Sequence, residues 1–131
     1  MLNQEHLDTD AFLKGWADDA VWDGPSDLGI GETIRGKAAI ADWYKRWDQE
    51  FPKRTFVAGT VCTNGAYLPN RDNVMTCEWT CTETDRHGRD FVVDGVAVFR
   101  SRNMKVVGAT DYISLVGLPQ LSTLLKPTGD V

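Results

Sequence analysis

The stretch VMTCEWTCTETDRHGRDFVVDGVAVFRS, residues 74–101, decides the fold class of this chain. Its two ends are rich in threonine, valine and aromatic residues, which favour strands. Its middle, Asp85-Arg86-His87-Gly88, is typical of a hairpin turn with glycine at a position of positive φ. A second turn at Arg102-Asn103-Met104 leads into another strand over residues 105–115. With a further strand at residues 55–62, the sequence predicts an antiparallel meander.

Helical patterns precede this meander. Asp8-Thr9-Asp10 offers capping oxygens to a short helix that we place at residues 11–16. Residues 37–50 carry the strongest helical pattern, with one apolar stripe along the helix. Phe51-Pro52 ends it, because proline disfavours helical geometry in the residue before it. Helices followed by a meander predict an α+β fold.

The composition indicates one globular domain over residues 1–131, with a generous supply of aromatic side chains. The net charge of −5, with no basic stripe, argues against nucleic acid as a partner. No apolar run reaches the ~18–20 residues that cross a bilayer, and the N-terminus does not resemble a secretory signal. Three cysteines without neighbouring ligands predict neither a disulfide framework nor a metal site. We therefore expect a cytoplasmic protein.

The long strand over residues 74–84 has two different faces, because side chains alternate along a strand. Cys77, Trp79 and Cys81 share one face, and Glu78 shares the other with two threonines. Either the apolar row is the core and Glu78 lies in water, or the polar row lines a cavity. In the second case another subunit would cover Cys77, Trp79 and Cys81.

Asp111 is unusual for its position in the last strand. It shares a face with Ala109 and Ile113, and aspartate is depleted in strand interiors. Its carboxylate therefore lies either in solvent near the strand end or inside a pocket.

Four segments together resemble the nuclear transport factor 2-like superfamily, most closely its limonene-epoxide hydrolase, ketosteroid isomerase and polyketide cyclase (SnoaL-like) branches. They are the residues 16–22, 34–40, 96–100 and 105–112, which read WADDAVW, IRGKAAI, VAVFR and KVVGATDY. The resemblance implies a cone-shaped, strongly curved mixed sheet with helices enclosing an apolar pocket, a cystatin-like α+β roll. It also implies a homodimer paired through the outer face of the sheet, which would bury Cys77, Trp79 and Cys81.

The resemblance carries over only one catalytic residue. Asp111-Tyr112 matches the aspartate that serves as base in the epoxide hydrolases of this superfamily. Their Arg-x-Asp motif falls on Glu78-Trp79-Thr80, and their water-holding Tyr and Asn fall on Trp22 and Gly24. Epoxide hydrolysis would thus require an altered catalytic set.

We expect Asp111 and Glu78 to face each other across the pocket. Two close carboxylates cannot both ionise easily, so one would be an acid beside a base, which suits proton shuttling. Asp94 is a second-rank acid, because alternation places it on the outer face unless the register slips by one residue. The residues that we expect to contact the ligand are Trp22, Tyr44, Trp47, Phe56, Thr80, Thr82, Val93, Ala109 and Ile113.

Two functions follow from this pattern. The first is a cofactor-independent isomerase, cyclase or dehydratase acting on a small apolar oxygenated molecule such as a polyketide, steroid or terpenoid. The second is a non-catalytic ligand-binding or dimerisation module, which predicts that Glu78 and Asp111 do not face each other. Members of the superfamily normally begin with a long helix over the mouth of the cone. Only residues 1–7 precede the capping segment of the first predicted helix here. Either the gene is truncated, or residues 116–125 take the place of the missing helix, or a partner subunit covers the gap, and we expect a wider, more open pocket.

Overall fold

A computed structural model describes residues 8–24, 33–66 and 68–114. Within these residues, six strands form one sheet in the order β2-β1-β6-β5-β4-β3. Their bounds are β1 (Trp16–Asp23), β2 (Thr33–Arg35), β3 (Lys53–Thr63), β4 (Asn73–Thr84), β5 (Asp90–Arg102) and β6 (Lys105–Ile113). β1 and β6 are parallel, whereas the other neighbours are antiparallel. The sheet is therefore mixed.

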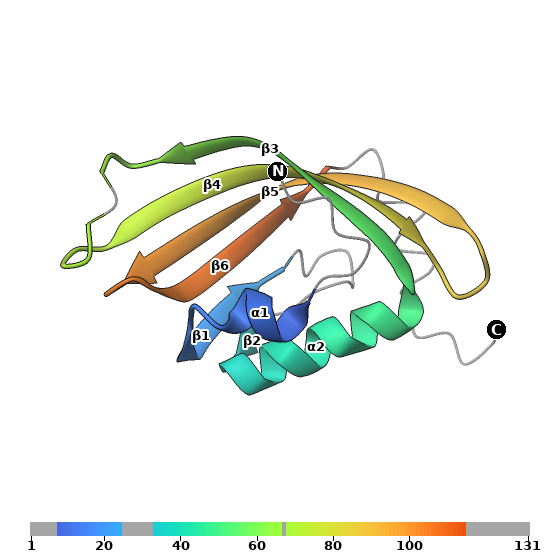
Figure 1. Cartoon of the computed structure of the whole chain (residues 1–131), viewed down its shortest axis with the longest axis horizontal. Helices are drawn as coiled ribbons and strands as arrows, with labels where there is room; N and C mark the ends of the chain where they lie inside the picture. The colour runs from blue at the N-terminus through green and yellow to red at the C-terminus, as the bar shows by residue number, and fades with distance from the viewer. Residues whose placement is uncertain (1–7, 25–32, 67, 115–131) are drawn as a thin grey trace.

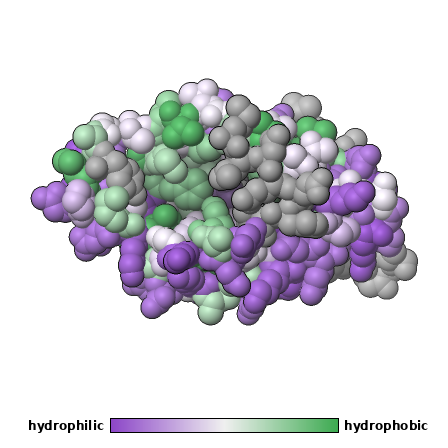
Figure 2. Space-filling model, viewed as in Figure 1, coloured by the Kyte–Doolittle hydropathy of each residue, from purple (hydrophilic) through white to green (hydrophobic). Residues whose placement is uncertain are grey.

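The helices α1 (Thr9–Leu13) and α2 (Lys37–Glu50) lie on one side of this sheet. Figure 1 shows β3, β4, β5 and β6 arching over both helices, so the helices cover the concave face. The outer side of α2 is hydrophilic, whereas apolar residues gather between the sheet and the helices (Figure 2). This is the α+β architecture that the sequence predicts, with the strongly curved sheet that the resemblance implies.

Both predicted turns of the meander are present. Gly88 has a φ of +81° in the β4–β5 turn, a conformation that residues with a side chain rarely adopt. The Asp85 carboxylate accepts hydrogen bonds from the backbone N–H groups of His87 and Arg89, at 2.9 and 2.8 Å. In the β5–β6 turn, Asn103 and Met104 have φ values of +51° and +65°, as a two-residue hairpin turn requires.

The first helix is shorter than the sequence suggested. Asp8 caps it by accepting from the Ala11 N–H at 3.1 Å, as predicted, but the helix ends at Leu13. Trp16, assigned to this helix from its spacing, instead begins β1. The reason is a tertiary contact: the Val106 N–H donates to the Gly15 carbonyl at 2.9 Å, which ties this segment to β6. Pairing with the sheet thus overrides a local helical pattern.

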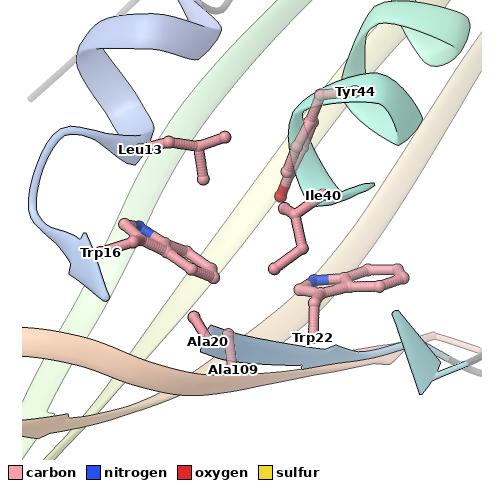
Figure 3. Packing of buried hydrophobic residues seen from close by; sticks show 7 residues of the cluster. All are labelled: Leu13, Trp16, Ala20, Trp22, Ile40, Tyr44 and Ala109. Atoms are coloured by element: carbon pink, nitrogen blue, oxygen red, sulfur yellow. The ribbon is translucent and has the colours of Figure 1, made fainter. Parts of the chain in front are cut away.

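Two apolar clusters fill the concave side. Figure 3 shows the larger one, in which side chains of α1 and α2 meet those of β1 and β6. Its buried members are Leu13, Trp16, Ala20, Trp22, Ile40, Tyr44 and Ala109. The second cluster joins the end of α2 to the far half of the sheet through Phe51, Phe91 and Val93.

The expectations for residues 1–7 and 116–125 concern segments outside the described residues. Among the described residues, no helix is long and apolar enough to span a membrane.

Candidate active site

The two faces of β4 are reversed relative to the predicted pocket. Trp79 and Cys81 point to the concave side: Cys81 is 1% exposed and pairs across the sheet with buried Val93. Cys77 shares this face by alternation. The expectation that Cys77, Trp79 and Cys81 form an outer interface is therefore wrong. The apolar row is the core, which was the first of the two alternatives.

Glu78, Thr80 and Thr82 lie on the outer, convex face instead. The Thr80 hydroxyl donates to the Asp94 carboxylate at 2.7 Å, in an exposed cross-strand pair. Glu78 is exposed beside them, so Glu78 and Asp111 occupy opposite faces of the sheet. The expected pairing of these two acids is wrong, because β4 presents its odd-numbered residues to the helices. Asp94 is on the outer face as alternation predicts, with no register slip.

Asp111 lies on the concave face of β6. It pairs across the sheet with Ala97 of β5, and Trp22 of β1 donates its indole N–H to the Asp111 carboxylate at 3.0 Å. The nearby Trp79 indole also lowers the pKa of this carboxyl group. Loss of solvent around Asp111 raises its pKa from 3.8 to about 6, although both indoles pull it down. Asp111 is therefore poised to exchange a proton near neutral pH.

Tyr44 approaches Asp111 from α2. Burial and the nearby Asp111 charge raise the pKa of the Tyr44 phenol far above its ordinary value, so this hydroxyl stays neutral. A neutral phenol can donate a hydrogen bond to a substrate oxygen.

Three tryptophans form a continuous aromatic wall beside these groups. The ring centroids of Trp22 and Trp43 are 4.6 Å apart, and those of Trp43 and Trp47 are 5.1 Å apart. Trp47 continues the row to Phe51 at 5.0 Å. Such flat apolar surfaces suit a ligand with rings.

The predicted ligand contacts divide between the two faces. Thr80 and Thr82 are on the outer face, away from Asp111. The others belong to the helix α2 or the concave face of the sheet: Trp22, Tyr44, Trp47, Phe56, Val93, Ala109 and Ile113.

Glu83 is a buried acid of the concave face that the sequence analysis missed. It is 2% exposed, and its Oε1 accepts from the Trp47 indole at 2.7 Å and from the Cys81 thiol at 3.5 Å. Its Oε2 is buried with no hydrogen-bond partner among the described residues. Burial raises the pKa of Glu83, while its cross-strand neighbour Arg54, which pairs with Asp48, opposes the shift. Alternation from Trp79 would have placed Glu83 inside.

The concave face thus carries a base, a neutral phenol and an aromatic wall. No three His, Cys, Asp or Glu side chains come together as metal ligands in the described part of the chain. The arrangement can remove a proton from a bound molecule and return it elsewhere.

A family model described as SnoaL-like domain matches residues 2–109. The chain belongs to the SnoaL-like family. Asp111 lies just beyond the matched residues, so its assignment depends on the geometry above. No curated protein sequence matches the chain.

Several solved structures have the same fold as this chain. An NTF2-like protein of unknown function from Burkholderia pseudomallei K96243 is 18% identical, with a TM-score of 0.71 over 91% of this chain and 86% of that chain. TerC co-crystallised with polyporic acid is 18% identical, with a TM-score of 0.70 over 88% of this chain and 86% of that one. A hypothetical protein with a ketosteroid isomerase-like fold from Catenulispora acidiphila DSM 44928, in complex with trimethylamine, is 18% identical, with a TM-score of 0.69 over 91% of this chain and 85% of that chain. At these identities the likeness concerns the fold.

Proposed function

We propose that this SnoaL-like protein is a cofactor-independent acid–base enzyme in which Asp111 is the general base. The observation that carries the proposal is the Asp111 carboxyl group on the concave face, which accepts a hydrogen bond from the neutral Trp22 indole and has a pKa of about 6. A base with that pKa is largely ionised at neutral pH, yet far more basic than a solvated carboxylate.

The proposed chemistry is a proton shift in a small apolar oxygenated molecule such as a polyketide, steroid or terpenoid. Asp111 would take a proton from carbon next to a carbonyl, and the C–H electron pair would form the enolate double bond. Tyr44 would donate a hydrogen bond to the enolate oxygen. Asp111 would then return the proton to another carbon, which completes an isomerisation, or the enolate would attack a second carbonyl, which closes a ring.

A generic substrate tests the base without knowledge of the natural one. Ring opening of a nitrobenzisoxazole needs only removal of one C–H proton as the N–O bond breaks, and the nitrophenolate product absorbs visible light. We expect turnover that rises with pH through about 6 and falls at least a hundredfold in Asp111→Asn. Trp16→Phe, which alters an aromatic residue of the larger cluster, is the control. Equal turnover by Asp111→Asn and wild type would contradict the proposal.

A binding module of the same fold is the second candidate. It is favoured by one observation: Glu78 and Asp111 do not face each other, as that hypothesis predicts. The raised pKa of Asp111 favours the enzyme instead. The variant Asp111→Asn distinguishes the two functions. It would retain its affinity for the ligand whether the protein is an enzyme or a binding module, but it would lose turnover only if the protein is an enzyme. An epoxide hydrolase with an altered catalytic set would release a diol from an epoxide in the same assay series.

We also propose a homodimer through the outer face of the sheet, with different residues from those expected. Val57, Val92 and Tyr112 lie on this face and are 39%, 59% and 60% exposed. Val57 and Tyr112 line an open groove of about 510 Å³ that is formed by residues of β3 to β6. Exposed apolar side chains on one face support association, and a second copy of the chain is the occupant we propose.

A further inference from the structure

Trp79 lies two strands away from Asp111, and a small residue stands between them. In the sheet order, β5 separates β4, which carries Trp79, from β6, which carries Asp111. Two strand spacings amount to roughly 10 Å, so the indole must extend across β5 to reach the carboxyl group. The residues of β5 that pair with Trp79 and Asp111 are Gly95 and Ala97.

Gly95 leaves the space that the indole fills. A Cβ atom at residue 95 would stand 2.3 Å from Trp79 Cζ2 and 2.7 Å from Trp79 Cε2. Carbon atoms in contact prefer about 3.5–4.0 Å, so any side chain at this position would displace the indole. The same Cβ would stand 2.6 Å from the Tyr112 carbonyl oxygen of β6. The Trp79 ring therefore lies directly on the backbone of β5.

We propose that Gly95 and Trp79 are positioning residues for Asp111: the bare Cα of Gly95 lets the Trp79 indole cross β5 and donate its N–H to the Asp111 carboxylate. Trp22 donates from the β1 side of Asp111 at 3.0 Å, and the Trp79 indole, which lies over Gly95, lowers the pKa of the same carboxyl group from the β4 side. The Phe56 ring, 6.0 Å from Trp79 and nearly edge-on to it, supports the indole from β3. The effect on catalysis rests on the proposed function, whereas the effect on the Asp111 proton does not.

The groups around Asp111 leave this proton sensitive to Trp79. From α2, Asp111 faces the Tyr44 phenol, which stays neutral. The row of β4 and β5 beside it holds Cys77 and Ala97, and burial raises the pKa of the Cys77 thiol. From β1 it faces the uncharged Trp22 indole. No charged group among these neighbours would mask the loss of one indole N–H.

The test is the Asp111 titration in Trp79→Phe. Phenylalanine keeps most of the apolar surface but has no N–H group. Loss of this group destabilises the Asp111 carboxylate relative to the protonated Asp111 carboxyl group. In protein labelled with carbon-13 aspartate, the Asp111 carboxyl resonance is the one that Asp111→Asn removes. We expect its midpoint to move up from about 6 by about one pH unit. Trp16→Phe, the same substitution away from Asp111, should leave the midpoint in place.

Gly95→Ala tests the second half of the proposal. It should raise the Asp111 midpoint in the same direction, and adding Trp79→Phe should then change little, because the indole is already displaced. Where Gly95→Ala does not fold, the comparison of Trp79→Phe with Trp16→Phe decides alone. A folded Trp79→Phe with an unchanged midpoint would overturn the proposal, and a folded Gly95→Ala with an unchanged midpoint would remove Gly95 from it. A shifted midpoint without nitrobenzisoxazole turnover in wild type would uphold the positioning and reject the enzyme.

Discussion

Replacing Asp111 by asparagine should stabilise this protein at neutral pH. The Asp111 carboxyl group has a pKa of about 6 in the folded chain and an ordinary value of 3.8. A carboxyl group whose pKa rises on folding does not lower the free energy of unfolding at a pH where it is protonated in both the folded and the unfolded chain. Stability is then lost as the pH rises from about 3.8 to about 6, because only the unfolded chain ionises freely there.

The size of the effect follows from the same two values. Their difference corresponds to at most about 3 kcal/mol above pH 6. The effect of the indoles is already part of this difference, because they lower the pKa of the folded chain. Asparagine resembles the protonated acid, so we expect Asp111→Asn to be more stable than wild type by about 3 kcal/mol at pH 8, and by about 0.5 kcal/mol near pH 4.

Urea unfolding followed by tryptophan fluorescence at a series of pH values measures this difference, and the chain has five tryptophans to report it. Asp94→Asn removes one carboxylate from the outer face and controls for the change in net charge. A free-energy difference between Asp111→Asn and wild type that stayed constant from pH 4 to pH 8 would refute the raised pKa. Equal slopes of the unfolding curves are required for the comparison, because a changed slope indicates a changed unfolded or native state.

Two further outcomes follow from the structure. Glu83→Gln keeps an acceptor for the Trp47 indole and removes a buried acid whose pKa is raised, so we expect about 1 kcal/mol higher stability at neutral pH in thermal unfolding. A large loss instead would mean that an ionised Glu83 is stabilised by Arg54. Tyr112→Arg places a charge in the exposed apolar patch of the outer face, and light scattering should show the proposed dimer dissociating, whereas Lys105→Arg should leave it intact.

The sequence predicts the meander well because its signals are local. Gly88 and the pair Asn103-Met104 occupy backbone conformations that few sequences favour, and the segments between them are rich in β-branched residues. The face of Asp111 was also correct, because alternation fixes which residues share a face. What alternation cannot fix is which face is inside. On β4 the answer depends on Trp47 and Phe51 at the end of α2, distant in the sequence, which belong to the same apolar cluster as Trp79.

Glu83 was missed for a related reason. It lies next to a polar hairpin turn, where a glutamate is normally solvated. Its burial depends on Trp47 of α2 and Arg54 of β3, which lie roughly 30 residues away in the sequence. Contacts of this kind are decided by the curvature of the sheet, which brings the end of β4 over the end of α2 (Figure 1).

The choice of tryptophan around the buried acids has an electrostatic consequence. An indole offers one N–H donor, no acceptor and no charge. Asp111 can therefore be oriented by Trp22 and Trp79 without the strong fall in pKa that a guanidinium would cause. The buried arginine of this face, Arg54, pairs with Asp48 instead. The arrangement holds a carboxylate in place and leaves it basic, which a salt bridge to the same carboxylate would not do.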